Sequence, residues 1–265
     1  MRILSLGAGV QSTTLALLMA HGKVEPVDHA IFADTQWEPR AVYDHLSWLR
    51  SGNVLPFPVH IVSLGDIRQN ILDRRNTGGG RFAAVPWFII NPDGTWGMGR
   101  RQCSYEYKLK PIMHKVRDLL GVSRMARIAP GEVEVNIGIS LDEAHRMREA
   151  EQQYMRNVYP LVDLGMTRTD CLGWLQRNGY PRPPKSSCIG CPFTSDERWL
   201  DMKQNRPEEW SDAVEVDRAL RLGDARAMNG TEFMHEDRIP LDEVKFDNEK
   251  QPDLFGNECL GMCNL

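Results

Sequence analysis

The chain has 265 residues, of which 42% are hydrophobic and 26% charged, which is ordinary for a globular protein with one large domain or a domain and an appendage. Its formal net charge of −4 argues against nucleic-acid binding by bulk electrostatics alone, although a local basic patch is compatible with it. No apolar run approaches the roughly 18 residues that cross a bilayer, and glycine and polar residues interrupt the stretch behind Arg2, so neither a membrane partner nor a signal peptide is expected. We expect a cytoplasmic protein whose six cysteines are metal ligands, catalytic groups or buried hydrophobes rather than disulfides.

The chain starts with a predicted strand, a glycine turn and a helix. The apolar run 3–6 precedes the turn 7–9, and a helical stretch follows at 14–21. This order brings backbone N–H groups and the positive end of a helix dipole to one point, which suits a phosphate. We expect the glycines to let the backbone approach the phosphate closely and to adopt a positive φ. Ser12 and Thr13 are expected to add hydroxyl donors.

Strands and helices then alternate, as they do in a mostly parallel sheet with helices on both faces. The next predicted elements are strand 30–33, helix 39–50, strand 60–63 and helix 67–74 with Asp66 as its cap. Asp34 follows the second strand directly and would lie at its carboxyl end, where open α/β sheets place their ligand contacts. The predicted fold class is therefore α/β and Rossmann-like.

The remainder of the chain is predicted to be mixed and then helical. Its first predicted elements are a hairpin at 87–98 around the turn 91–94, a helix from Pro111 to 120 and a strand at 133–139. A helix capped by Ser140 and Glu143 comes next, followed by an extended piece at 159–162. The last predicted elements are a helix at 170–178, capped by Asp170, and further helices from 195. We divide the chain into an α/β domain, 1–195, and a helical carboxyl-terminal extension, 196–265, with a cysteine-containing tail.

The pair Cys188-x-x-Cys191 has the spacing of a metal or cluster knuckle, and also that of a redox dithiol. Cys103, Cys259 and Cys263 are available as further ligands. Cys171 lies within a predicted helix and is expected to be a buried small hydrophobe.

The turn at 7–12 is open to three interpretations. Its Gly-x-Gly-x-x-Ser pattern is close to a dinucleotide fingerprint, with Asp34 in the place of the ribose-binding acid, but serine replaces the third glycine. No Gly-Lys-Ser/Thr follows, which excludes a Walker loop. A tight turn without a ligand is the second interpretation, and the third comes from a resemblance.

Residues 5–12 resemble the PP-loop of the adenine-nucleotide α-hydrolase superfamily, which includes ATP pyrophosphatases, tRNA thiolation enzymes and PAPS reductases. The usual pattern is Ser-Gly-Gly-x-Asp-Ser, so this chain departs from it at Ala8 and at Gln11, where the acid is replaced. Residues 101–111 resemble a stretch of APS and PAPS reductases and of Dnd-type phosphorothioation sulfurtransferases. Further segments resemble the same group, and the likeness covers about residues 1–195; these segments are 138–146, 159–163 and 184–193.

The resemblance implies a PAPS reductase-like fold, a nucleotide site and the residues that form it. The implied nucleotide-binding residues are Ser5, Gly7, Ala8, Gly9, Gln11, Ser12, Thr13, Asp34, Arg101, Gly138, Glu143 and Arg146. Lys108 is implied as a catalytic residue, within a basic cluster that would contact phosphate or sulfate; a solvated basic face is the alternative for that cluster.

The resemblance also implies a [4Fe-4S] cluster. In cluster-bearing APS reductases a Cys-Cys pair joins a later Cys-x-x-Cys pair, and the second cysteine of the first pair is Ser104 here. The matched ligands are therefore Cys103, Cys188 and Cys191, which leave one iron open unless a tail cysteine closes the site. The tail, 257–263, resembles the Glu-Cys-Gly tail of PAPS reductases, which makes Cys259 and Cys263 candidate nucleophiles. The alternative is zinc, held by Cys188, Cys191, Cys259 and Cys263.

Together these features predict an enzyme that binds ATP or another adenine nucleotide, with Mg²⁺ as a candidate ion. It would adenylate an acceptor, for which nucleic acid is a candidate, and release pyrophosphate. The cluster would then present sulfur to the activated acceptor, and a sulfur donor or reductant is an expected partner. One alternative is reduction of PAPS or APS with a tail cysteine as nucleophile. A non-catalytic nucleotide- and cluster-binding sensor or assembly subunit is another. The sequence predicts no oligomeric state.

Overall fold

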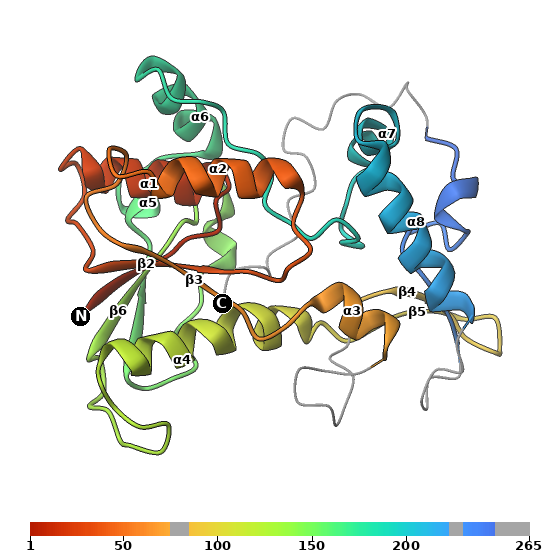
Figure 1. Cartoon of the computed structure of the whole chain (residues 1–265), viewed down its shortest axis with the longest axis horizontal. Helices are drawn as coiled ribbons and strands as arrows, with labels where there is room; N and C mark the ends of the chain where they lie inside the picture. The colour runs from red at the N-terminus through yellow and green to blue at the C-terminus, as the bar shows by residue number, and fades with distance from the viewer. Residues whose placement is uncertain (75–84, 223–229, 247–265) are drawn as a thin grey trace.

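The centre of the fold is a five-stranded sheet, in a computed structural model that describes residues 1–74, 85–222 and 230–246. The strands lie in the order β3-β2-β1-β6-β7, and every neighbouring pair is parallel (Figure 1). They are β1 (Arg2–Ser5), β2 (His29–Ala33), β3 (Val59–Val62), β6 (Val133–Ile137) and β7 (Met155–Val158). The predicted α/β, Rossmann-like fold is confirmed.

Helices cover both faces of this sheet because side chains alternate along each strand and feed two separate cores. Leu4 and Phe32 pack on one face with α1 (Val10–Ala20), α2 (Arg40–Arg50) and α6 (Arg168–Arg177). Ile3 and Ile31 pack on the other face with α4 (Lys110–Leu119). Figure 1 shows α1, α2 and α6 on one side of the strands and α4 on the other.

The direction of strand addition reverses between β1 and β6. The chain first builds outward from β1 through β2 to β3, and then adds β6 and β7 on the other side of β1. Such a reversal is a topological switch point, and open α/β sheets place their ligand crevice at the carboxyl ends of the two strands that flank it.

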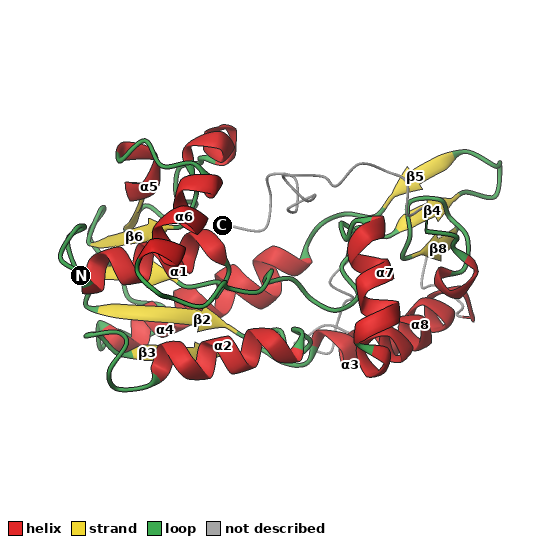
Figure 2. Ribbon diagram, turned by 90° about the horizontal axis from the view of Figure 1, so that it is seen from above, coloured by secondary structure: helices red, strands yellow, loops and turns green. Residues whose placement is uncertain are grey.

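A second, three-stranded antiparallel sheet lies at the far end of the molecule from β3 and β7 (Figure 2). The predicted hairpin forms its strands β4 (Phe88–Ile90) and β5 (Trp96–Met98), and β8 (Thr231–Phe233) pairs with β4. It packs with α3 (Ile67–Leu72), α7 (Asp196–Asn205) and α8 (Pro207–Leu222) around a core that contains Trp37, Trp87 and Trp199. Segments before and after residue 195 thus build one core together.

Three local predictions were wrong. The segment after Ser140 is a 3₁₀ helix, Leu141–Arg146, and no capping box forms at its start. The side chain of Ser140 makes no capping bond, and the carboxylate of Glu143 accepts from Gln11 in the crevice instead. The stretch predicted as extended at 159–162 contains α5 (Pro160–Asp163), since proline at the first helical position favours a helical turn. Thr167, not Asp170, is the N-cap of α6, and Asp170 is the third residue of its capping box.

The helix before Pro111 is irregular. Residues Tyr105–Leu109 form a π-helical turn that runs directly into α4. A proline has no N–H to donate to the carbonyl four residues earlier, and its ring clashes with that carbonyl, so the wider π turn relieves both problems. The turn sets the direction of Lys108. Among the described helices, none has the length and apolarity to cross a bilayer.

Candidate functional site

The loop between β1 and α1 has the geometry of an anion-binding turn. Ala8, rather than either glycine, takes the positive φ, 56°, and the N–H of Gly7 donates to Oγ of Ser12 at 3.2 Å. Gly9 is the N-cap of α1 and provides no side-chain cap, so the first-turn N–H groups face the crevice with the positive end of the helix dipole.

Gly138, just after β6, lies directly against this loop. A Cβ at this position would lie 2.7 Å from both the backbone N and the Cα of Ser12, which is far inside normal contact. Glycine is therefore required here because the two loops of the crevice touch, backbone to backbone.

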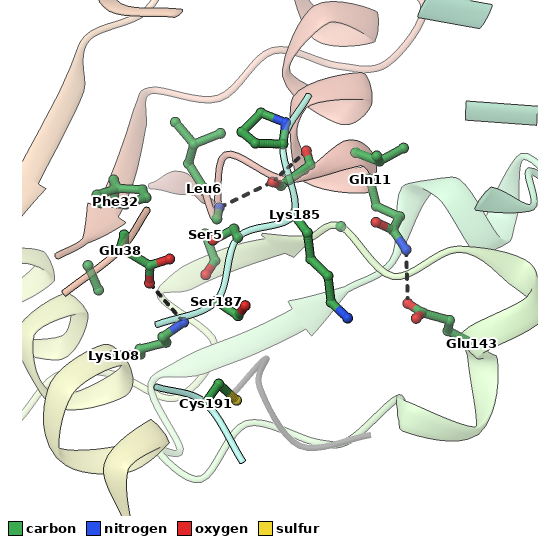
Figure 3. Close-up of a pocket in the computed structure, with 18 of the residues that line it drawn as sticks. Ser5, Leu6, Gln11, Phe32, Glu38, Lys108, Glu143, Lys185, Ser187 and Cys191 are labelled. Atoms are coloured by element: carbon green, nitrogen blue, oxygen red, sulfur yellow. Dashed lines mark hydrogen bonds and ion pairs between the residues drawn. The ribbon is translucent and has the colours of Figure 1, made fainter. Parts of the chain in front are cut away.

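The crevice contains a pocket of about 120 Å³ between the carboxyl ends of β1, β2 and β6 (Figure 3). The segment 184–187 closes its open side, and Cβ of Ser186 lies 3.7 Å from the position that a Cβ on Gly9 would take. Ten of the residues predicted from the sequence line it: Ser5, Gly7, Gly9, Gln11, Ser12, Lys108, Gly138, Glu143, Arg146 and Cys191.

A chain of polar contacts crosses one wall of the pocket. Gln11 donates from Nε2 to Oε2 of Glu143 at 3.2 Å, and Arg146 donates from Nη1 to Oε1 of the same carboxylate at 2.6 Å. Arg146 is 7% exposed, and its Nε has no hydrogen-bond partner among the described residues. A buried donor without a partner carries a desolvation penalty, so the ion pair with Glu143 is what holds the guanidinium at this wall.

The opposite wall contains a buried ion pair. Nζ of Lys108 lies 3.6 Å from Oε1 of Glu38, whose side chain is 1% exposed. Burial raises the pKa of Glu38, and Oε2 has no hydrogen-bond partner in the described part of the chain. Burial disfavours the ammonium of Lys108, yet Glu38 raises the pKa of Lys108 overall. Figure 3 shows Lys185 reaching between this pair and the Gln11–Glu143 contact.

The three cysteines assigned to a cluster line a second, mainly apolar pocket. Cys188 Sγ lies 3.3 Å from Oγ1 of Thr35, and burial raises the pKa of both Cys188 and Cys103. Arg101 also lines this pocket and opposes the increase at Cys103. Cys191 and Lys108 line both pockets, together with Ser187 and Phe193.

The donor set at the second pocket fits an iron–sulfur cluster in type. Three thiols share the pocket with Arg101 and Lys108, whose positive charges would offset those of thiolates. Among the described residues, no three His, Cys, Asp or Glu side chains converge on the position of a single metal ion. Cys259 and Cys263 lie outside the described residues, so the fourth ligand and the zinc alternative remain predictions.

Four of the predicted nucleotide-binding residues do not line the first pocket. Thr13 is fully buried and its Oγ1 bonds Nε2 of His45 at 3.0 Å. Asp34 braces its own turn, accepting from Tyr43 and from the N–H of Gln36. The other two are Ala8, which is buried, and Arg101, which lies in the cysteine pocket.

Sequence analysis missed Glu38, Thr35 and Lys185 as residues of these pockets. Glu38 and Thr35 lie in the turn after β2, where the sequence pointed only to Asp34. Lys185 follows a run of prolines between the end of α6 and the Cys188-x-x-Cys191 pair, and a lysine in such a loop carries no local signal that points to a pocket. Each depends on a contact between segments distant in sequence.

Comparison with known proteins yields little. No protein-family model matches the chain, and neither does any curated protein. Among solved structures, the phosphate complex of phosphoadenylyl-sulfate (PAPS) reductase from Candida auris is similar with a TM-score of 0.44 and 14% identity, over 69% of this chain and 74% of that one. A likeness of this size assigns no activity or ligand to the chain.

Proposed function

We propose that the chain is an adenine-nucleotide-dependent enzyme of the sulfurtransferase type. It binds ATP or a related nucleotide in the first pocket and adenylates an acceptor oxygen with release of pyrophosphate. Sulfur at the sulfide level, delivered by an external sulfur donor and held at the cysteine pocket, then attacks the activated carbon and displaces AMP. One observation carries this proposal: the phosphate-type cradle and the three-cysteine pocket share a wall made of Lys108, Ser187, Cys191 and Phe193. A dinucleotide site or a plain strand–helix turn leaves that shared wall without a purpose.

The phosphates would lie at the start of α1. The first turn of α1, Lys185 and Arg146 all line this space. The two carboxylates of the pocket are each matched by a cation, Glu38 by Lys108 and Glu143 by Arg146. The arrangement therefore favours an anion and provides preorganised donors for charge that develops during adenylation. Mg²⁺ would enter with the nucleotide's phosphates.

Cys103, Cys188 and Cys191 would hold a [4Fe-4S] cluster, which supplies an iron with an open position for a sulfur atom. Lys108 lies between the two pockets and keeps its proton because Glu38 stabilises the ammonium. Its charge would orient the pyrophosphate that leaves toward the cradle during adenylation, and then the AMP that is displaced by sulfide from the cysteine side. The apolar lining of the cysteine pocket would exclude water from that transfer.

Two measurements on anaerobically purified full-length protein test the proposal. We expect a brown protein containing iron and sulfide, and pyrophosphate release from ATP in the presence of an acceptor. Colourless protein with one bound zinc would contradict the cluster. Sulfite release from PAPS without pyrophosphate release from ATP would establish the reductase alternative, and nucleotide binding without turnover of either would establish the sensor alternative.

A further inference from the structure

Four aromatic rings gather where α1, α2 and α6 end. His21 contacts Trp174 edge-on at 5.5 Å, and Trp174 stacks with Tyr180 at 5.9 Å and 21°. Tyr180 also contacts Trp48 at 6.0 Å, and its hydroxyl bonds Nε2 of His21 at 2.6 Å. We call His21, Trp48, Trp174 and Tyr180 the aromatic patch. Three of its members are half-buried against the core, and His21 is exposed.

Each ring of the aromatic patch is followed within two or three positions by a cation. These are the exposed side chains of Lys23, Arg50, Arg177 and Arg182. No Asp or Glu lies within three positions of any of the four rings, and no described carboxylate forms a salt bridge with Lys23, Arg50 or Arg182. Arg50 and Arg177 also suit the last turns of their helices. Lys23 and Arg182 lie outside helices, so capping does not explain them.

A surface hollow of about 600 Å³ opens beside the patch. Tyr180 and Arg182 line it together with Leu175, Gln176 and Gly179 at the end of α6. An aromatic ring, an unpaired guanidinium and aliphatic carbons are thus available to one flat, partly apolar ligand. The hollow is large enough for a nucleobase.

We propose that the aromatic patch and its four cations bind single-stranded nucleic acid. Bases would stack on exposed ring surface, with Tyr180 at the hollow, while Lys23, Arg50, Arg177 and Arg182 would contact phosphates. An acidic peptide would use the cations but not the stacked rings or the hollow. Because the chain as a whole has a net charge of −4, a polyanion would be attracted to this local group of cations and not to the surface in general.

The patch is connected to the candidate active site in two ways. Its rings lie at the carboxyl end of α1, whose amino end forms the phosphate cradle, and the 11-residue helix separates them by about 16 Å. The segment that begins at Tyr180 carries Lys185 into the phosphate pocket. The bound strand would therefore be the acceptor, and this assignment, unlike the binding itself, rests on the proposed function.

Fluorescence anisotropy with labelled 15-mers of oligothymidylate and oligouridylate tests the binding. The full-length protein is titrated with ATP in excess, so that the oligonucleotide does not occupy the phosphate pocket. We expect both probes to bind at low salt, and the Arg177→Ala/Arg182→Ala variant to bind at least tenfold more weakly. Losing two phosphate contacts should flatten the slope of log K against log salt by about 1.4.

The matched control is Arg124→Ala/Arg127→Ala, which removes the same charge from exposed positions beyond α4, on the other face of the sheet. It should bind within about twofold of the unmodified protein. Equal losses in the two variants, no binding of either probe by the unmodified protein, or preference for a labelled oligoglutamate would each overturn the proposal. Pyrophosphate release is measured separately, so a failed function with intact strand binding is distinguishable from the reverse.

Discussion

The contact between Gly138 and the phosphate loop gives the sharpest test of the site. In Gly138→Ala, the new methyl group meets the backbone N and Cα of Ser12 at 2.7 Å and the carbonyl carbon of Gln11 at 3.0 Å. Ordinary contacts begin at 3.4 Å, so the loop must retreat by about 0.7 Å at its tightest point. Gly138 does not have a positive φ, so the substitution acts through this clash and not through backbone strain.

The cost of such overpacking is about 1–3 kcal/mol. If the loop holds its position, the cost lowers the free energy of unfolding; if it moves, the cradle loses its geometry and nucleotide affinity falls. Because 1.4 kcal/mol corresponds to tenfold in Kd, the second outcome weakens ATP binding by about 5- to 150-fold. Urea unfolding without nucleotide and calorimetric titration with ATP measure the two parts, and together they should account for the full 1–3 kcal/mol.

Gly52→Ala is the matched control, since a Cβ there meets nothing within 4 Å. It should change the free energy of unfolding by less than about 0.5 kcal/mol and leave ATP affinity unchanged. If Gly138→Ala matched this control in both measurements, the two loops would not touch as described, and the pocket between them would have to be abandoned.

Three further predictions follow from single contacts. Lys185→Ala should weaken ATP binding at least fivefold in calorimetry, because its ammonium borders the phosphate space; an unchanged Kd would remove it from the site. Burial raises the pKa of Glu232 from 4.5 to about 7, so the folded protein binds this proton more tightly than the unfolded chain does. The stability that comes from the protonated side chain is complete below pH 4.5 and is lost as the pH rises through 7. Glu232→Gln should therefore gain about 2–3 kcal/mol over the unmodified protein at pH 8 but not at pH 4, in urea unfolding at both pH values; equal effects at the two would contradict the buried carboxylate. Thr167→Ala removes the capping box of α6 and should cost about 1 kcal/mol in urea unfolding, whereas Thr169→Ala, at an exposed position of the same helix, should cost less than about 0.5 kcal/mol.

Local patterns predicted most of the elements correctly. The strand, glycine turn and helix at the amino terminus formed as expected, because buried apolar runs and helix signals act over a few residues. The Asn-Pro-Asp-Gly turn likewise produced the β4–β5 hairpin. Eight of the ten predicted residues that line the first pocket lie at or just after the carboxyl ends of β1 and β6, which a parallel sheet gathers at one edge.

The predictions that failed concern side chains whose bonding depends on a distant partner. Glu143 has the spacing of a capping box, yet it bonds Gln11 and Arg146, because a carboxylate binds a charged donor and an amide donor more strongly than one backbone N–H. Thr13 looked like a phosphate donor, but its place on α1 points it to His45. Helical phase, fixed only by packing, decided which hydroxyl faced the pocket.

By itself, the sequence predicted the fold class and the strand, glycine turn and helix at the amino terminus. The family resemblance added the grouping of Cys103, Cys188 and Cys191, which line one pocket in the structure. Only the tertiary structure decided that β1 and β6 flank the crevice, that Glu38 and Lys185 enter it, and that Lys108 forms the wall between two pockets. The physical reason is the distance along the chain over which the deciding interactions act. Strands, turns and caps are set by neighbours along the chain, whereas a buried charge is placed by whichever partner from another segment offsets its desolvation.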